Sequence, residues 1–404
     1  MGEGVAVLVL SALLGIQPIT TDLYLPALPS LSTSLGASMT QAQLTLSALL
    51  IAFGLSQLVW GSLSDRFGRR PVLLAGLGAY TLAAIGSTLA PSMDALVLWR
   101  VLQGAAMGAA VSCARAIVRD LYHPAQGARV MSQALSGLGV LAVISGPLGG
   151  LMSDLFDWRA ALAVLAVFGA ATLALVAARM PETLPRHPGG PAAPALLRRW
   201  LQVLRHPTFV AYCVLSLASY AGVFVYLAAS SFVFIQVLAV GKTNYGLLMA
   251  PVSISYLAGT FLCRRLLARF GLRHTVAIAS ALTLASGTAM GLSGLLGWAG
   301  GAHGAWFILL PMFGFMVGHG VHQPCAQTGA VGPFPHAAGS AAALNGFLMM
   351  LVAFIVGAWL GARMDGTVLP LTNGIWFWSV VIAVTGWTLV QRHGDGVQAD
   401  DAGR

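Results

Sequence analysis

Charged side chains are scarce in this chain. Asp, Glu, Lys and Arg make up only 8% of its 404 residues, whereas soluble globular proteins carry about 25%. The sequence contains no soluble signalling domain, glycine-rich phosphate loop or nucleophile–base pair. We therefore do not expect an enzyme, and an ATP-driven pump within this chain is excluded. The four cysteines lack the spacing of a metal site. We therefore predict free, buried thiols, no bound metal and no cofactor.

Apolar residues dominate what is present, at 57% of the chain. Runs long enough for a membrane-spanning helix, which needs about 20 apolar residues, centre near positions 15, 51, 81, 106, 141, 168, 222, 255, 285, 316, 348 and 382. Because helices satisfy their own backbone hydrogen bonds in lipid, we predict an all-α membrane protein of about twelve spans. The first run begins directly after Glu3, without a cationic segment or a convincing cleavage site, and is interpreted as a retained span.

The net charge of +9 reports topology and does not indicate nucleic-acid binding. The cations gather in alternate loops or at the helix ends that face them: Arg66, Arg69, Arg70, Arg129, Arg179, Arg186, Arg198, Arg199, Arg205, Arg264, Arg265, Arg269, Arg273 and Arg392. The other loops hold little beyond Arg159, Lys242 and Arg363. This positive-inside pattern predicts that both termini are cytoplasmic.

The longest polar interruption, residues 181–207, divides six predicted spans from six. We expect an N-terminal half at 1–180, a cytoplasmic linker with a short surface helix at 196–204, a C-terminal half at 208–392 and a tail at 393–404. The loop at 264–273 echoes the one at 61–71, because both hold Arg-Phe-Gly followed by Arg, although an Asp is missing from the later loop. Two related halves suit a transporter that rocks about a central site.

The most specific motif is a basic turn between spans two and three: Gly61-Ser62-Leu63-Ser64-Asp65-Arg66-Phe67-Gly68-Arg69-Arg70-Pro71. Such a turn cannot lie in hydrocarbon, so it must be a tight aqueous connection. Its order resembles the signature loop of the major facilitator superfamily of transporters. The resemblance implies a twelve-helix fold in two six-helix halves. It also implies a cytoplasmic gate made of Gly61, Asp65, Arg66, Gly68, Arg69, Arg70 and Asp120.

Two contacts are expected at this gate. Asp65 accepts hydrogen bonds from the N-terminus of span eleven, near residues 336–340, and Arg69 pairs with Asp120 at the end of span four. Both contacts hold the cytoplasmic side shut and break when it opens. The alternative interpretation is that the loop only anchors the topology.

Further elements resemble the Bcr/CflA-type drug-exporting branch of the superfamily. They are Asp22-Leu23-Tyr24-Leu25-Pro26, Arg100-Val101-Leu102-Gln103-Gly104, Arg119-Asp120 and Pro335-His336-Ala337-Ala338-Gly339. The resemblance implies a monomer in the bacterial inner membrane. It implies export of small amphipathic drugs, such as bicyclomycin and chloramphenicol, in exchange for protons and driven by the proton-motive force.

Asp22 and Arg100 are the candidate proton-coupling residues. Asp22 is the only carboxylate well inside an apolar run, where an ionised group is costly unless it is paired or hydrated. Some related exporters carry a second carboxylate earlier in span one, where this chain has Leu14. Arg100 either biases the protonation of Asp22 or ties span four to backbone carbonyls of span one. Asp22, in turn, is either a proton carrier or a hydrated residue at a helix end.

Candidate cavity residues share helix faces in several spans. Aromatic rings with a few hydroxyl groups suit lipophilic compounds, although ordinary helix packing explains many of these positions equally well. His319 and His322 lie three residues apart and share a helix face. Three interpretations are open: they line the cavity, they titrate and take part in proton coupling, or they pack in the core. The full set is Tyr24, Gln43, Ser47, Gln103, Met107, Tyr220, Phe224, Tyr226, Ser231, His319 and His322.

Span five carries Gly146, Pro147, Gly149 and Gly150. In antiporters of the family a similar element is associated with the direction of transport, although here a single residue separates the proline from the glycine pair. Close helix packing explains these glycines nearly as well. Two alternatives to export remain open, namely a proton-coupled uptake symporter for a small metabolite and a membrane receptor or scaffold that does not transport.

Overall fold

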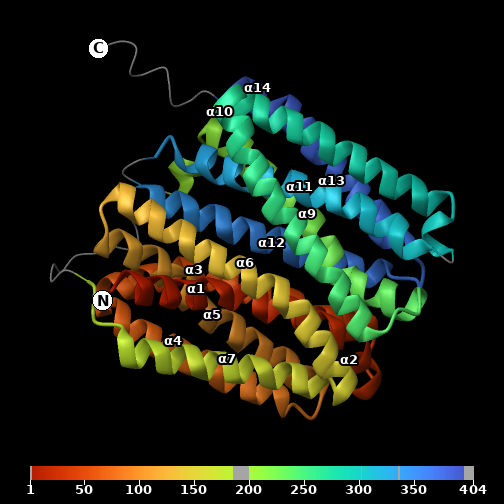
Figure 1. Ribbon diagram of the computed structural model, residues 1–404, viewed down its shortest axis with the longest axis horizontal. Coiled ribbons are helices and arrows are strands. Elements are labelled where there is room, and N and C mark those ends of the chain that lie inside the picture. The colour runs from red at the N-terminus through yellow and green to blue at the C-terminus, as the bar shows by residue number, and fades with distance from the viewer. Residues whose placement is uncertain (1, 185–199, 302, 335–336, 395–404) are drawn as a thin grey trace. The chain divides into compact units, whose positions relative to one another are not determined.

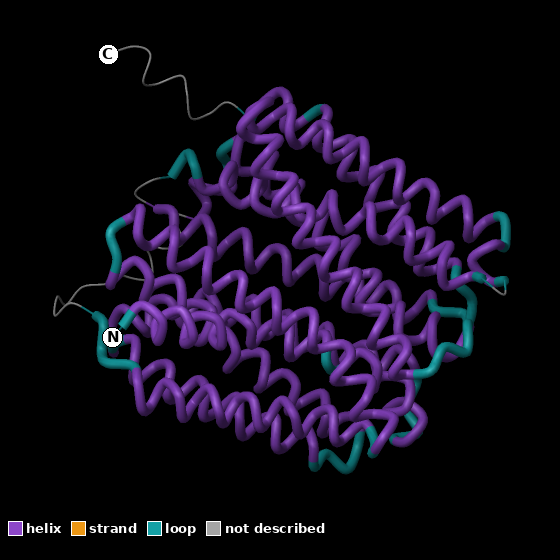
Figure 2. The backbone as a smooth tube through the Cα atoms, viewed as in Figure 1, coloured by secondary structure: helices purple, strands orange, loops and turns teal. Residues whose placement is uncertain are grey.

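The computed structural model describes residues 2–184, 200–301, 303–334 and 337–394, and every regular element within these ranges is a helix. Eleven helices in this part of the chain are long and apolar enough to cross a membrane. The predictions of an all-α fold and of a multi-pass membrane protein are therefore confirmed (Figures 1 and 2). The linker prediction falls mostly outside the described residues, although 200–204 are helical.

Contacts divide the chain into two compact units, and the first comprises Met1–Gly190 and Val240–Ala250. Its elements are α1 (Glu3–Asp22), η1 (Leu25–Ala27), α2 (Leu28–Ser34), α3 (Met39–Phe67), α4 (Arg69–Thr88), α5 (Met93–Leu121), α6 (Pro124–Leu155) and α7 (Trp158–Arg179). Helix α5 packs against α3, α4 and α1, α6 packs against α1, and α4 lies beside α7 (Figure 1).

The second unit comprises Pro191–Ala239 and Pro251–Arg404. Its elements are α9 (Pro207–Phe232), the π-helical turn η2 (Val233–Val237), most of α10 (Lys242–Leu295), η3 (Trp298–Gly300), α11 (Gly304–Val331), α12 (Ala338–Arg363), α13 (Leu369–Trp387) and α14 (Leu389–His393). Helix α9 is the centre of this unit, because it packs against α11, α12 and α13.

Helix α10 has 54 residues and a break at Gly271. The φ angle of Gly271 is 71°, which is a left-handed conformation that glycine adopts without a steric cost. The stretches on either side of the break match the two apolar runs near 255 and 285, which were predicted to be separate spans.

The first residues of α10 belong to the first unit through contacts with α6. The carboxylate of Asp154, near the end of α6, accepts hydrogen bonds from the Thr243 backbone N–H at 2.8 Å and from the Thr243 hydroxyl at 2.5 Å. Lys242 Nζ donates to the Ser153 carbonyl at 3.3 Å. The two helices also touch through glycine, since a Cβ at Gly246 would clash with the backbone of α6.

Large apolar side chains point outward from several helices of both units. Leu82 is 66% exposed, Val167 68%, Ile355 57% and Phe377 59%. Water-soluble monomers rarely expose apolar surface on this scale. The exposed side chains therefore form the surface that a bilayer would cover.

Candidate functional site

Asp22 lies where the first membrane-spanning segment is interrupted. It is the last residue of α1, and the candidate span continues through η1 and α2 to Ser34. Pro18 and Pro26 flank it in the sequence, so backbone N–H groups are missing on both sides and the helix is weakened there. The half-buried Asp22 carboxylate accepts a hydrogen bond from the Thr21 hydroxyl at 2.8 Å. No ion pair reaches it from the described residues.

Arg100 on α5 is fully buried and has no carboxylate partner within the described ranges. Its Nη1 donates to Gln103 Oε1 at 2.8 Å, and its Nη2 donates to the backbone carbonyl of Thr20 at 3.2 Å. Its guanidinium carbon lies 4.3 Å from the ring centre of Tyr24. The positive charge of Arg100 is thus stabilised by the amide oxygen of Gln103, the Thr20 carbonyl and the face of the Tyr24 ring. The contacts with Thr20 and Tyr24 also tie α5 to the end of α1.

Hydroxyl groups from three helices surround this arginine. Thr20 Oγ1 and Tyr80 Oη lie 2.6 Å apart, and Tyr24 Oη lies 2.5 Å from Thr45 Oγ1. Sequence reasoning missed Thr20, Thr45 and Tyr80. Their only signal was a hydroxyl group in an apolar run, and the sequence does not show which distant helix supplies the partner.

A glycine lets α5 approach α3 next to Arg100. A Cβ at Gly104 would clash with the backbone carbonyl of Leu49, so the two helices are in backbone contact at this point. Gly104 lies one turn after Arg100, on the same face of α5.

The structure brings two of the predicted cavity residues in this unit, Tyr24 and Gln103, into contact with Arg100. Gln43, Ser47 and Met107 are buried on α3 and α5. The Ser47 hydroxyl donates to the carbonyl of Gln43, in its own helix, at 3.1 Å.

In the second unit, the two histidines of α11 contact different partners. His319 Nδ1 lies 2.8 Å from Ser219 Oγ, and its ring lies against Tyr256 at 5.5 Å. His322 Nε2 lies 3.2 Å from Thr283 Oγ1. Among the described residues no group of three or more His, Cys, Asp or Glu side chains is arranged to hold a metal ion. The other candidates lie on α9 and are buried or half-buried: Tyr220, Phe224, Tyr226 and Ser231.

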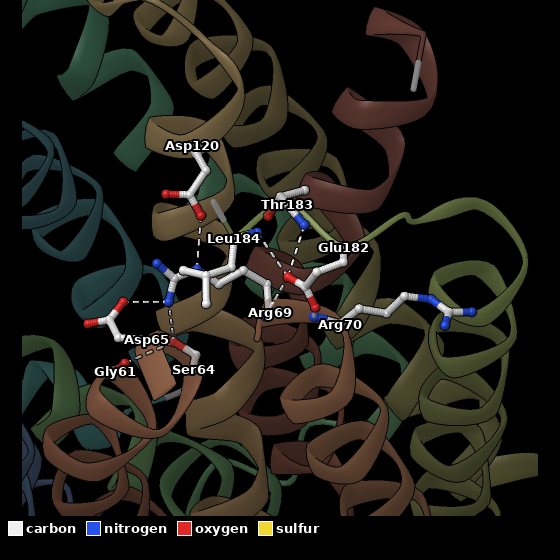
Figure 3. A network of polar contacts seen from close by, with 9 residues as sticks. All are labelled: Gly61, Ser64, Asp65, Arg69, Arg70, Asp120, Glu182, Thr183 and Leu184. Carbon is white, nitrogen blue, oxygen red and sulfur yellow. Dashed lines mark hydrogen bonds and ion pairs between the residues drawn. The ribbon is translucent and has the colours of Figure 1, made fainter. Parts of the chain in front are cut away.

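The basic turn forms an ion-pair network around Arg69, the first residue of α4 (Figure 3). Its Nε donates to Asp120 Oδ2 at 2.9 Å, and its Nη1 donates to Asp65 Oδ1 at 2.5 Å and to Ser64 Oγ at 2.8 Å. The side chain of Arg69 is 2% exposed, that of Asp120 8% and that of Asp65 43%. The network therefore joins the ends of α3 and α5 to the start of α4, and the Arg69–Asp120 pair is shielded from solvent.

The placement of Arg69 against Asp120 agrees with the pairing expected from the sequence. Asp65 is held by Arg69, and its expected contact with the start of span eleven stays a prediction. His336, one of the residues named for that contact, lies outside the described ranges.

The other residues of the turn make separate contacts. Arg70 Nη2 donates to the Ala177 carbonyl at 2.9 Å, and Arg66 lies 5.3 Å from the ring of Phe67. Space is open where a Cβ at Gly61 would lie, so packing does not explain that glycine.

Glu182 completes this network, and sequence reasoning missed it. Its Oε1 accepts hydrogen bonds from the backbone N–H groups of Arg69 at 2.8 Å and of Thr183 and Leu184 at 2.9 Å, and its Oε2 accepts one from Arg70 N at 3.1 Å (Figure 3). Glu182 thus caps the N-terminus of α4, where backbone donors lack partners and the helix dipole favours an anion. The signal in the sequence was an acidic residue shortly after span six, at a membrane face rich in arginine.

Gly68 makes room for this cap. Its φ angle of 100° is a conformation that other residues rarely adopt, and a Cβ there would lie 2.5 Å from Glu182 Oε2. Partial burial opposes ionisation of Glu182, but the hydrogen bonds from the four backbone N–H groups outweigh it and lower the pKa of this carboxyl below its ordinary value. The cap is therefore fully ionised at neutral pH.

Glu182→Gln is expected to destabilise the start of α4 by about 1 kcal/mol, the usual contribution of a helix cap. The amide is neutral, and its NH₂ group cannot accept the hydrogen bonds that one carboxylate oxygen accepts. Because the pKa in the folded protein is depressed, the stabilisation is present above the ordinary glutamate pKa and is lost as the pH falls through the depressed value.

Thermal unfolding of the purified protein at neutral and at acidic pH measures this effect. Glu182→Gln should lower the melting temperature at neutral pH, and the difference from wild type should shrink in acid. Thr183→Ala is the matched control, because Thr183 contacts the cap through its backbone N–H alone. Equal melting of Glu182→Gln and wild type at neutral pH would contradict the capping role.

The glycines of span five contact two other helices. A Cβ at Gly149 would clash with the backbone carbonyl of Leu23, directly after Asp22. A Cβ at Gly150 would lie 2.5 Å from the carbonyl of Lys242, and one at Gly146 would lie 2.8 Å from Met249 Cβ. Pro147 lies inside α6 between these contacts. The glycines therefore allow α6 to pack closely on the end of α1 and on the start of α10.

Comparison with known proteins assigns this arrangement to a family. Residues 10–358 match the model of the Major Facilitator Superfamily. Multidrug resistance protein D of Escherichia coli (strain K12) is 30% identical over 345 residues, which are 84% of each protein. A bicyclomycin resistance protein homolog of Haemophilus influenzae is 26% identical over 90% of this chain and 91% of its own length.

The fold is shared with a solved transporter. The crystal structure of a D-xylose–proton symporter matches with a TM-score of 0.74, covering 96% of this chain and 98% of that one, at 17% sequence identity. At this identity the match supports the fold and says nothing about the transported compound.

Proposed function

Because this chain belongs to the Major Facilitator Superfamily, we propose that it exports small amphipathic compounds, drugs among them, in exchange for protons across a bacterial inner membrane. The names of its relatives, which include multidrug and bicyclomycin resistance proteins, support the export of drugs. The observation that carries proton coupling is Arg100. It is buried without a carboxylate partner in the described chain and is bonded to the carbonyl of Thr20, two residues from Asp22.

In the proposed cycle, Asp22 takes up and releases the proton. It is the one carboxylate well inside an apolar run, and Arg100 bonds to the Thr20 carbonyl just before it. Loss of a proton leaves Asp22 negative, and the positive charge of Arg100 is proposed to favour that state during the cycle. The proton-motive force supplies the energy, since each charge that crosses 100 mV is worth about 2.3 kcal/mol. No bound cofactor is needed.

The proposed topology has twelve spans, with the two parts of α10 crossing separately on either side of Gly271. We propose an N-terminal half at 1–180, a cytoplasmic linker at 181–207, a C-terminal half at 208–392 and a cytoplasmic tail at 393–404. The positive-inside pattern of arginines supports cytoplasmic termini. The functional unit is proposed to be the monomer.

A drug-susceptibility panel in a host that lacks its own pumps tests the proposal. Expression of the chain should raise resistance to several amphipathic compounds, and collapse of the proton gradient should abolish that gain. An uptake symporter or a scaffold without transport would leave resistance unchanged or reduce it. Either of those results would overturn the assignment of export.

The network at Arg69 is proposed to favour the state closed to the cytoplasm. Asp65→Asn weakens an exposed pair worth about 1 kcal/mol or less. Asp120→Asn removes a buried partner and should have the larger effect. Since about 1.4 kcal/mol changes a ratio tenfold, we expect reduced transport and an increased population open to the cytoplasm, by up to about tenfold in Asp120→Asn.

Thiol labelling measures this shift. Gly339→Cys, at an exposed position of α12, is introduced where the four native cysteines have been replaced, and labelling from the cytoplasm is compared with and without the gate substitution. Asp94→Asn, an exposed carboxylate at the start of α5, is the control. Unchanged labelling together with reduced transport would mean that the loop does not act as a latch.

A further inference from the structure

Two cysteines of the second unit are in contact, close in sequence to the cationic residues Arg264 and Arg265. Cys263 on α10 and Cys325 on α11 have their sulfur atoms 3.6 Å apart. Both are buried, at 2% and 1% exposure. The Cys263 thiol also lies 3.8 Å from the carbonyl of Val321. All four cysteines lie in the described ranges, and no other pair of them has its sulfurs in contact.

Glycine brings these two helices together. A Cβ at Gly259 would clash with the carbonyl of Val317, and a Cβ at Gly320 would clash with the carbonyl of Tyr256. The backbones of α10 and α11 are therefore in direct contact about one turn from the two thiols. A disulfide needs Cα atoms about 4.4–6.8 Å apart and sulfurs about 2.05 Å apart. The backbone contact of the two helices favours the first condition, and the second requires rotation of the side chains to bring the sulfurs together from 3.6 Å.

We propose that Cys263 and Cys325 are a redox modification site, which a lipid-soluble two-electron oxidant closes to a reversible disulfide that locks α10 against α11. Two S–H bonds break and one S–S bond forms. The two electrons and two protons leave with the oxidant, so molecular iodine yields two molecules of hydrogen iodide. Because both sulfurs are buried, charged reagents have little direct access to them, and we expect small neutral oxidants such as iodine to react best.

The lock is expected to stop transport, and this part rests on the proposed function. The bond would restrain the part of α10 between Pro251 and Gly271 against α11. Both of these helix segments belong to the second unit, so the bond blocks shifts of α10 against α11 within that unit and leaves rigid rocking free. We expect the transport cycle to need such shifts, so the oxidised protein should lose transport and the reduced protein should regain it. The formation of the bond itself requires no transport, so its measurement stands even if the exported compounds differ from those proposed.

The test uses the full chain in proteoliposomes treated with molecular iodine. In the Cys113→Ala/Cys213→Ala variant, alkylation after denaturation should find no free thiol, and dithiothreitol should restore both. With Cys325→Ala added, the thiol of Cys263 should stay free, and iodine should no longer inhibit transport. This last variant also separates the disulfide from iodine damage to other side chains.

Three outcomes would overturn the proposal. The first is that both thiols stay free in the membrane while iodine oxidises them in protein unfolded by detergent. The second is that Cys113 or Cys213 pairs with Cys263 or Cys325 in the native chain. The third is that the disulfide forms completely and transport is unchanged, which would show that the bond does not stop transport.

Discussion

Asp22→Asn is expected to abolish drug-driven proton release in membrane vesicles while the protein still inserts and folds. Asn matches the shape of Asp and can still accept the hydrogen bond from the Thr21 hydroxyl, but it cannot exchange a proton. No other carboxylate lies well inside an apolar run of this chain, and the earlier position in span one is Leu14. A single substitution should therefore remove the coupling completely.

Two controls make the result specific. Asp94→Asn changes an exposed carboxylate at the start of α5 and should leave proton release intact. The amount of protein in the membrane and its melting temperature should be the same in both variants and in wild type. Unchanged proton release by Asp22→Asn would remove Asp22 from the mechanism.

Arg100→Lys is the second substitution for which we expect a large effect, despite the retained charge. The guanidinium bonds to Gln103 and to the Thr20 carbonyl and stacks on Tyr24. An ammonium group has no planar fork with which to reach all three. Hydrogen bonds to charged groups are worth about 1.5–3 kcal/mol each, so losing one should reduce transport roughly tenfold to hundredfold.

Resistance and transport rates of Arg100→Lys and Arg179→Lys measure this effect side by side. Arg179 is a suitable control, because it is an exposed arginine in the last turn of α7. If Arg100→Lys transports as well as wild type, then the fork geometry has no role and only a positive charge, or nothing, matters at that position. If folded protein is lost in Arg100→Lys but not in Arg100→Gln, the loss of transport in Arg100→Lys would instead be caused by reduced stability of the fold.

Features that depend on one stretch of chain could be predicted from the sequence. Apolar runs of bilayer length gave the helices, because backbone hydrogen bonds in lipid leave few alternatives. The basic turn at 61–71 indicated a tight connection and a pair between Arg69 and Asp120, which the structure brings together. The pair between Arg69 and Asp65 was not expected, because Gly68 separates the two helices that carry them. The roles assigned to this turn, to Asp22 and to Arg100 stay predictions.

Features that depend on distant partners could not be predicted in this way. Glu182 lies more than 100 positions from Arg69 and Arg70, and it accepts hydrogen bonds from their backbone N–H groups. The periodicity of one helix carries no information about contacts between residues so far apart in the sequence. The same holds for Tyr80 and Thr20, and for Asp154 and Thr243. The glycines of span five suggested close packing, but their neighbours, the end of α1 and the start of α10, required coordinates.

The start of α10 has a mechanical consequence for the whole chain. Within about a dozen residues the chain leaves the second unit, joins the first at Val240–Ala250 and returns. The first crossing point is Ala239, a non-glycine residue with a φ angle of 54°. The second is Pro251, which removes a hydrogen bond from the helix, and Ser255 donates its hydroxyl to the Pro251 carbonyl at 2.8 Å.

The residues between these two points are fastened to α6 by Asp154 and by glycine contacts, so these turns of helix form a stiff segment that moves with the first unit. Substitutions at Ala239 and Pro251 should change how easily the chain bends at the ends of this segment more than how tightly either unit is folded.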